Sequence, residues 1–300
     1  MTTTTAAEPV LVPARGARIA TYRLGDAAAI TPGVPPLLLV GSPMDSTGFG
    51  TLASHFPDRL VVLVDPRNTG RSERDDPSAA VTVEQHAEDL HAVVEALGDG
   101  PVDLFGSSGG ATNGLALVAA HPDDVRLLVA HEPPLAALLP DADGVRAATE
   151  DILAAYDAGG SGPAMARFIA LVSHRGPVDA DFRARPAPDP AAFGLPTTDD
   201  GTRDDPLMAN MRGGGVGWTP DLEALRAART RVVVAVGEES GGPDDGEMAG
   251  RGGHALAAAL GRPPVVLPGG HAGFLGGEYG QTGRPVEFAR ALRAVLAGDA

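Results

Sequence analysis

The 300-residue sequence contains no cysteine, so disulfide bonds, thiolate catalysis and cysteine-ligated metal sites are all excluded. It also contains no lysine, and each of its 23 basic residues is an arginine. The lysine-containing phosphate-binding loop of nucleotide hydrolases is therefore absent. Aromatic residues make up only 4% of the chain, which leaves leucine, valine and alanine to fill most of the core.

Positive charge is also scarce, and the excess of acidic residues gives a formal net charge of −16. Phosphate backbones and anionic membranes bind to basic surfaces, so we expect neither a nucleic-acid partner nor a membrane partner. No apolar run is long enough to span a bilayer, and residues 1–9 lack the basic and apolar regions of a secretory signal. We expect a cytoplasmic protein with a frayed N-terminus. The sequence does not decide between a monomer and a homodimer.

Short apolar runs bounded by turn residues alternate with helical patterns over most of the chain. Such runs are typical of strands buried on both faces of a parallel sheet. One helix is predicted to begin after Thr82, where Gln85 completes a capping box, and to end at Gly98. The alternation predicts an α/β fold with a mostly parallel, doubly wound sheet. The expected strands are 10–12, 18–24, 37–40, 60–64, 102–105, 125–130, 231–236 and 264–267.

The segment 135–220 differs from the rest because it contains no strand-like run. Helical patterns over 144–156 and 164–173 precede a stretch rich in proline, aspartate and glycine. Long loops inside a compact domain are usually functional or mobile. We therefore expect a helical cap inserted ahead of the last two strands, with 1–134 and 221–300 forming the α/β core.

The pentapeptide Gly106-Ser107-Ser108-Gly109-Gly110 fits the G-x-S-x-G nucleophile elbow. It lies between a predicted buried strand and a helix rich in small residues, which is the context that this motif requires. A sharp turn there exposes Ser108 as a nucleophile. The N-terminus of the following helix directs free N–H groups toward any negative charge that develops beside it.

A glycine-flanked histidine, His271, follows the last predicted strand. Serine before histidine is the order of these residues in α/β-hydrolases, unlike the two best-known serine protease folds. In an open α/β sheet the ligand binds at the carboxyl ends of the strands. We expect five loops to converge there, carrying Ser42, Asp65, Ser108, Glu132 and His271.

Five features together resemble the α/β-hydrolase superfamily over about residues 10–296: the loop 40–43, the turn 65–72, the elbow, the cap and Gly269-Gly270-His271. The resemblance implies that Ser108 attacks an acyl carbonyl and that His271 takes up and returns the proton. It also implies an oxyanion hole formed by the backbone N–H groups of Ser42 and Gly109, and it implies no cofactor.

Two positions depart from the family pattern. Val40-Gly41 replaces the usual His-Gly of the oxyanion loop, and Ser240 occupies the usual place of the triad aspartate, three residues after Gly237. We therefore predict Glu132 as the acid, because it follows the next strand after the elbow helix, an alternative acid position in the superfamily. Glu239 is the alternative acid. The remaining rivals on the usual loop are Glu238, Asp244 and Asp245.

Other polar residues receive structural interpretations. His131 neighbours Glu132 but should point to the opposite face of its strand. His86 and His91 are expected on the solvated side of their helix. Because the histidines are scattered in the sequence, we expect no metal site. Asn210 and Trp218 belong to the predicted cap and are expected to serve in packing.

The sequence thus predicts a serine hydrolase that cleaves an ester, lactone or thioester of a small to medium apolar substrate through an acyl-Ser108 intermediate. Serine at the elbow argues against haloalkane dehalogenase and epoxide hydrolase chemistry, which the superfamily performs with aspartate. Several alternatives stay open: a cofactor-free perhydrolase or haloperoxidase-like enzyme, an acyltransferase or cyclase, and a non-catalytic ligand-binding protein on a hydrolase scaffold.

Overall fold

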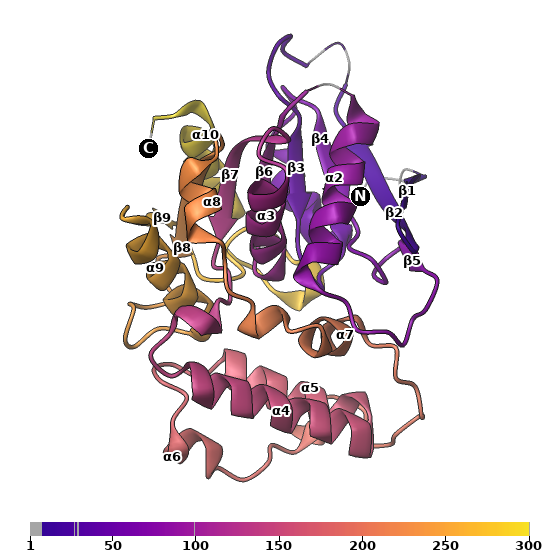
Figure 1. Ribbon diagram of the computed structural model, residues 1–300, viewed down its shortest axis with the longest axis vertical. Coiled ribbons are helices and arrows are strands. Elements are labelled where there is room, and N and C mark those ends of the chain that lie inside the picture. Colours follow the sequence, from indigo (N-terminus) through magenta and orange to yellow (C-terminus); the bar gives the residue numbers. More distant parts are fainter. Residues whose placement is uncertain (1–7, 27, 29, 99, 300) are drawn as a thin grey trace.

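The computed structural model describes residues 8–26, 28, 30–98 and 100–299. A central sheet carries helices on both faces, and a further layer of helices lies across one end of the strands (Figure 1). Residues 1–7, on which most of the predicted N-terminal fraying falls, lie outside the described range. None of the described helices is both long enough and apolar enough to cross a bilayer.

The described strands form one sheet in the order β1-β2-β4-β3-β6-β7-β8-β9, with β5 pairing to β2. Neighbouring strands from β4 to β9 are parallel, whereas β2 is antiparallel to β1, β4 and β5. The mostly parallel sheet predicted from the sequence is therefore confirmed. The strands are β1 (Val10–Ala14), β2 (Ala17–Leu24), β3 (Leu37–Val40), β4 (Val61–Val64), β5 (Glu73–Arg74), β6 (Val102–Ser107), β7 (Val125–His131), β8 (Arg231–Gly237) and β9 (Val265–Leu267).

Two apolar clusters cover the two faces of the sheet. On one face α2, α3, α8 and α9 pack against alternate strand residues such as Leu38 and Val40. On the other face α1 and α10 pack against Leu37 and Leu39. The continuous burial of β3 explains why its sequence is apolar at every position. The helices of these layers are α1 (Gly50–Ser54), α2 (Val83–Leu97), α3 (Gly109–Ala120), α8 (Leu222–Ala227), α9 (Met248–Leu260) and α10 (Pro285–Ala297).

Local sequence signals account for the ends of several elements. Thr82 accepts a hydrogen bond from the Gln85 N–H while the Gln85 side chain accepts one from the Thr82 N–H, so the predicted capping box is present. Gly98 ends α2 in the left-handed conformation with φ 72°, which costs glycine little. The short helices α7 and α8 escaped prediction because their proline- and glycine-rich surroundings resemble loops.

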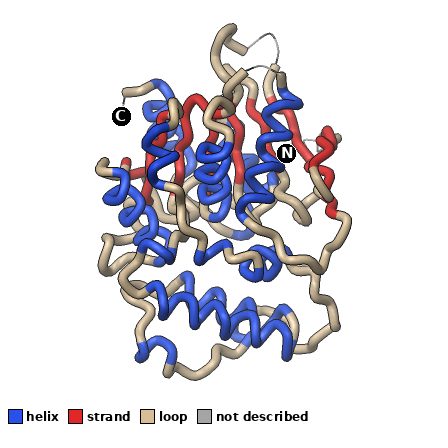
Figure 2. The backbone as a smooth tube through the Cα atoms, in the orientation of Figure 1, coloured by secondary structure: helices blue, strands red, loops and turns tan. Residues whose placement is uncertain are grey.

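The segment between β7 and β8 carries the helices that lie across the carboxyl ends of the strands (Figure 2). Among its described residues there is no strand, as the sequence predicts. An apolar cluster of its own includes Val145, Ile152, Tyr156 and Met208. Its helices are α4 (Ala142–Gly159), α5 (Ser161–Val172), α6 (Ala180–Arg183) and α7 (Pro206–Arg212). Short 3₁₀ helices lie at Ser46–Phe49, Ala136–Leu138, Pro190–Phe193, Gly215–Gly217 and Glu278–Gly280.

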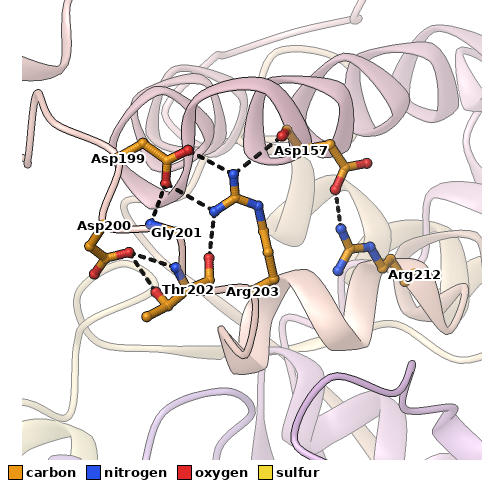
Figure 3. A network of polar contacts seen from close by, with 7 residues as sticks. All are labelled: Asp157, Asp199, Asp200, Gly201, Thr202, Arg203 and Arg212. Atoms are coloured by element: carbon orange, nitrogen blue, oxygen red, sulfur yellow. Dashed lines mark hydrogen bonds and ion pairs between the residues drawn. The ribbon is translucent and has the colours of Figure 1, made fainter.

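A polar network ties the long loop that follows α6 to α4 and α7 (Figure 3). Arg203 Nη2 lies 2.8 Å from Asp199 Oδ2 and 3.2 Å from the Asp157 carbonyl oxygen. Arg212 pairs with the Asp157 carboxylate, and both guanidinium groups lie over the ring of Tyr156. Arg203 thus holds the loop to the end of α4, and Arg212 holds α7 to the same end of α4.

Candidate active site

The elbow between β6 and α3 holds Ser108 in a strained conformation, with φ 56° and ψ −126°. Non-glycine residues with positive φ are uncommon and concentrate at functional sites. The turn is tight: a Cβ on Gly106 would lie 2.6 Å from the Gly110 carbonyl oxygen, and a Cβ on Gly110 would overlap the Val40 carbonyl. Both outer glycines of the pentapeptide are therefore required by close backbone approach.

The two predicted oxyanion donors lie next to each other. A Cβ on Gly109 would lie 2.5 Å from the carbonyl oxygen of Ser42, so the elbow and the loop after β3 are in close contact. Within the described chain, neither the Ser42 N–H nor the Gly109 N–H donates a backbone hydrogen bond. Gly109 is the first residue of α3, whose initial N–H groups have no partner inside the helix. Both residues line the cavity described below.

Glu132 and His271 are in direct hydrogen-bonding contact, with 2.7 Å between Glu132 Oε2 and His271 Nδ1. The other carboxylate oxygen, Oε1, accepts a hydrogen bond of 2.7 Å from the Gly237 N–H. Glu132 is fully buried and has a positive φ of 48°, so a second strained residue lies at this site. Its backbone N–H donates to the Ala235 carbonyl, which fixes the turn after β7. The carboxylate is thereby held in one orientation.

This pairing shifts both ionisation equilibria. Burial opposes the charged form of Glu132, but the hydrogen bond from His271 and the potential of His131 and His271 outweigh it and lower the Glu132 pKa to about 2. Burial likewise favours neutral His271, yet the bond to Glu132 and its charge raise the His271 pKa above its ordinary value. Because 39% of the His271 side chain is exposed, its desolvation is incomplete, and the Glu132 carboxylate has the larger effect on the His271 pKa.

Ser108 and His271 line one cavity of about 1070 Å³ between the carboxyl ends of the strands and the helical layer. Among the hydrogen bonds of the described residues, none joins Ser108 Oγ to His271. In ligand-free enzymes the nucleophile–base bond is often long and tightens only when substrate binds. The arrangement leaves His271 Nε2 available to the cavity while Nδ1 is occupied by Glu132.

The cavity wall is mainly apolar where the helical layer forms it. Its apolar members include Met165, Phe168, Ile169, Val172, Met211 and Met248. No arginine occurs among the described residues that line the cavity, whereas Asp45 and Glu247 do. The cavity therefore offers a large apolar surface to a ligand, and no arginine among its described lining residues that could bind an anionic group.

His131 lies beneath the site and belongs to the core. It is fully buried, its Nδ1 lies 3.0 Å from Ser107 Oγ, and its ring stacks on His271 with centroids 6.0 Å apart. Burial lowers the His131 pKa to about 4, so the ring is neutral near pH 7. Phe105, Phe274 and Phe288 surround it, and this neutral aromatic cluster supports the His271 ring from below.

A hydrogen-bonded chain that the sequence did not predict connects the helical layer to the loop after β3. His86 Nε2 lies 2.9 Å from Asn210 Oδ1, and Asn210 Nδ2 donates to Ser42 Oγ over 3.1 Å. His86 is buried, and burial lowers its pKa to about 4. A neutral imidazole that donates from Nε2 leaves the Asn210 amide to hold the Ser42 hydroxyl. All three residues line the cavity.

Several sequence expectations are wrong at this point. His86 is buried, not solvated, because α7 covers its side of α2 through Asn210. Asn210 contacts the site instead of serving only in packing, whereas Trp218 packs and donates to Glu84 over 2.9 Å. The loop that carries Asp65 reaches the cavity as expected, through Asn68, Thr69 and Gly70, while the buried Asp65 carboxylate accepts the N–H groups of Ser46 and Arg71.

The rival acids on the loop after β8 have other surroundings. Glu239 is exposed, and its backbone N–H donates to the Gly269 carbonyl. Glu238 pairs with Arg284, and Asp245 accepts the Gly242 N–H. None of these carboxylates bonds to His271 among the described contacts. The usual acid position holds Ser240, which is buried close to the Glu132 carboxylate.

The Asn210 contact yields a testable expectation. Asn210→Ala removes the only described side-chain bond to Ser42 Oγ, so we expect kcat for a neutral ester to fall about tenfold through loss of one neutral hydrogen bond. KM should change less, because the predicted role of the Ser42 loop is to stabilise an oxyanion that is absent from the ground state. Trp218→Phe is the control: it removes another bond to α2, from Trp218 to Glu84, without touching Ser42. Equal kcat losses in both variants would show that only general packing was disturbed.

Comparison with known proteins supports this fold. A family model for the alpha/beta hydrolase fold matches residues 37–200. The hydrolase YraK of Bacillus subtilis is 36% identical over 107 residues, which cover 35% of this chain and 40% of YraK. Lipase LipV of Mycobacterium tuberculosis is 36% identical over 107 residues, covering 35% of this chain and 38% of LipV. The matches thus span only about two fifths of these relatives.

Solved structures share the fold over nearly the whole chain. A thermophilic esterase from Thermogutta terrifontis superimposes with a TM-score of 0.68 and 20% identity, covering 98% of this chain and 99% of the esterase. The family model covers more than half of the chain, and the relatives are named hydrolase, lipase and esterase. This chain therefore belongs to the alpha/beta hydrolase fold family.

Proposed function

We propose that the protein is a serine hydrolase that cleaves an ester, lactone or thioester through a covalent acyl-Ser108 intermediate. The observation that carries the proposal is the 2.7 Å contact between Glu132 and His271 on the same cavity as Ser108 in its strained elbow. A serine needs an adjacent base to become a nucleophile, and the base needs a third group to orient it.

In the proposed reaction His271 Nε2 accepts the proton of Ser108 Oγ as that oxygen attacks the acyl carbon. Glu132 keeps the proton of His271 on Nδ1 and stabilises the imidazolium that forms. The protonated imidazole then gives its proton to the departing alcohol or thiol. Water attacks the acyl-enzyme with His271 again acting as the base, and Ser108 is released with the carboxylic acid product.

The N–H groups of Ser42 and Gly109 are proposed to stabilise the tetrahedral oxyanion. Both lie on the cavity wall beside Ser108, and neither is used in a described backbone hydrogen bond. One such donor is worth on the order of 3 kcal/mol of barrier. The Asn210 contact to Ser42 Oγ would keep the loop in register with the elbow.

The cavity favours a neutral acyl substrate of small to medium size. Its wall is apolar on the side of the helical layer, and its described lining residues include Asp45 and Glu247 but no arginine. A carboxylate or phosphate on the acyl chain would meet no arginine there. We also propose that residues 135–220 act as a cap domain over a core of 1–134 and 221–300, because α4, α5 and α7 have an apolar cluster separate from those of the sheet.

A fluorophosphonate probe tests the proposal directly. It should modify the protein once, and peptide mapping should place the adduct on Ser108. Labelling at another residue, or none in a folded sample, would refute the assignment. Turnover of a series of neutral p-nitrophenyl esters then tests the substrate class, and product analysis with peroxide or a second alcohol separates hydrolysis from perhydrolysis and acyl transfer.

The pH profile should report His271. The base must be neutral to act, and its pKa is raised, so kcat/KM should fall on the acid side with an inflection above the ordinary value of 6.5. In Glu132→Gln the contact and charge that raise this pKa are gone, while burial remains, so the inflection of the residual activity should move to lower pH. Measuring kcat/KM from pH 5 to 9 for both proteins checks this. An unchanged inflection would mean that Glu132 does not act on the base.

A further inference from the structure

Two histidines and an aspartate meet near the C-terminal end of α3, at the opposite end of this helix from the cavity. His91 lies on α2, His121 ends α3, and Asp124 precedes β7. His91 Nδ1 is 2.7 Å from Asp124 Oδ2, and the two imidazole rings stack with centroids 3.7 Å apart. One potential ligand atom from each residue lies within 4.8 Å of the others. Since α3 is twelve residues long, about 18 Å separates this cluster from the elbow.

Negative charge exceeds positive charge around the two rings. Glu88 Oε1 lies 2.8 Å from His121 Nε2, and Glu95 Oε2 lies 3.7 Å from His91 Nε2, in addition to the Asp124 contact. Three carboxylates therefore surround two imidazoles, and no arginine is paired with any of these three among the described ion pairs. This local excess of negative charge favours binding of a cation.

We propose that His91, His121 and Asp124 form a Zn²⁺ site that joins α2 to the turn between α3 and β7. Imidazole and carboxylate are ligands that Zn²⁺ prefers, and Glu88, which lies beside His121, would fill the fourth position that a structural site requires. The site is remote from Ser108 and independent of the proposed reaction, so its role is structural. The sequence analysis expected no metal site, because these residues come together only when α2 and α3 pack against each other.

Small side-chain movements would complete the coordination. Tetrahedral ligands at 2.0–2.2 Å from the ion lie about 3.4 Å from one another, so the present spread of 4.8 Å must contract. The stacked rings are nearly parallel, with 8° between their planes, and one must turn so that both nitrogens point at a single ion. The terminal torsion of histidine is broad, and all three side chains are only partly buried, with 25%, 24% and 15% exposed.

The test uses the full chain without a histidine tag, treated with EDTA and dialysed. Calorimetric titration with ZnCl₂ at pH 7.5 should give one equivalent bound to the wild type, and Zn²⁺ should raise Tm because it binds only the folded protein. His91→Ala and Asp124→Asn should each weaken binding at least tenfold and lose most of the Tm shift. His254→Ala, which removes a half-buried histidine on α9, should behave as the wild type.

If His91→Ala fails to fold, Asp124→Asn still tests metal binding, because asparagine keeps the size of the side chain and removes only the carboxylate. Affinity should also fall as the pH is lowered, because protons compete for the imidazoles. The proposal would be overturned if the wild type failed to bind one equivalent at 1 mM Zn²⁺, a concentration about a thousand times a micromolar Kd. Unweakened binding by folded Asp124→Asn would overturn it as well. Neither result bears on Ser108.

Discussion

Ser108→Ala is expected to reduce kcat/KM for a neutral ester by about 10⁴-fold or more, while the fold is retained. Alanine has no oxygen to attack the carbonyl, and the residual rate comes only from binding and from the N–H groups of Ser42 and Gly109. Fluorophosphonate labelling should disappear at the same time. Steady-state kinetics, circular dichroism and labelling of the purified variant provide the measurement.

The neighbouring serine supplies a matched control. Ser107 Oγ bonds to His131 Nδ1 beneath the site, so Ser107→Ala should keep labelling and lose at most about tenfold in activity. Retained turnover in Ser108→Ala together with loss in Ser107→Ala would reverse the roles of the two hydroxyls. Thermal denaturation adds a further check, because the strain at φ 56° is relieved only by glycine. Ser108→Gly should therefore melt above Ser108→Ala.

Glu132→Gln is expected to reduce kcat/KM by about 10³- to 10⁴-fold, whereas Glu239→Gln should stay close to the wild type. The amide is nearly the size of the carboxylate but carries no charge to stabilise the His271 imidazolium. It also presents an NH₂ group that competes for the position of one carboxylate oxygen. The same substrate and pH serve for both variants. Comparable losses in the two variants, or a loss only in Glu239→Gln, would contradict the choice of acid.

The acid should also be movable within this site. A Cβ added to Gly250 would lie 3.1 Å from Ser240 Cβ and 3.5 Å from Glu132 Oε1, so Ser240 and the carboxylate are near neighbours. The double variant Glu132→Gln, Ser240→Asp should have a kcat/KM at least tenfold higher than that of Glu132→Gln alone, because Ser240→Asp returns a carboxylate to the loop that carries Gly237. The single variant Ser240→Asp should instead lower Tm, since two carboxylates would then share a buried site. Absence of any rescue by a folded double variant would argue against this placement.

The Glu132–His271 pair should also make the free energy of unfolding depend on pH. Its pKa is about 2 in the folded protein and 4.5 ordinarily, so the folded state gains stability from it above pH 4.5 and loses that gain as the pH falls toward 2. The raised pKa of His271 acts in the opposite direction: its contribution is complete below about pH 6.5 and disappears as the pH rises through the folded value. The pair is therefore most stabilising between these limits.

The sequence by itself determined the core of the fold and the elbow that carries Ser108. Unbroken apolar runs such as Leu37–Val40 can be satisfied only by strands covered on both faces, and the capping box at Thr82 places a helix start without tertiary information. The elbow is equally local, because its glycines are required by close backbone contacts within a few residues and with one adjacent loop. These features depend on short-range geometry, which a sequence encodes directly.

Tertiary structure decided which side chains meet. Several acids on two loops could have served His271, and only the backbone turn at Glu132, with φ 48° and its N–H fixed to Ala235, directs one of them at the imidazole. The burial of His86 depends on α7 packing over α2, and the pairing of His91 with His121 depends on α2 packing against α3. Contacts between distant segments are set by how whole elements pack, and no local pattern of residues specifies that packing.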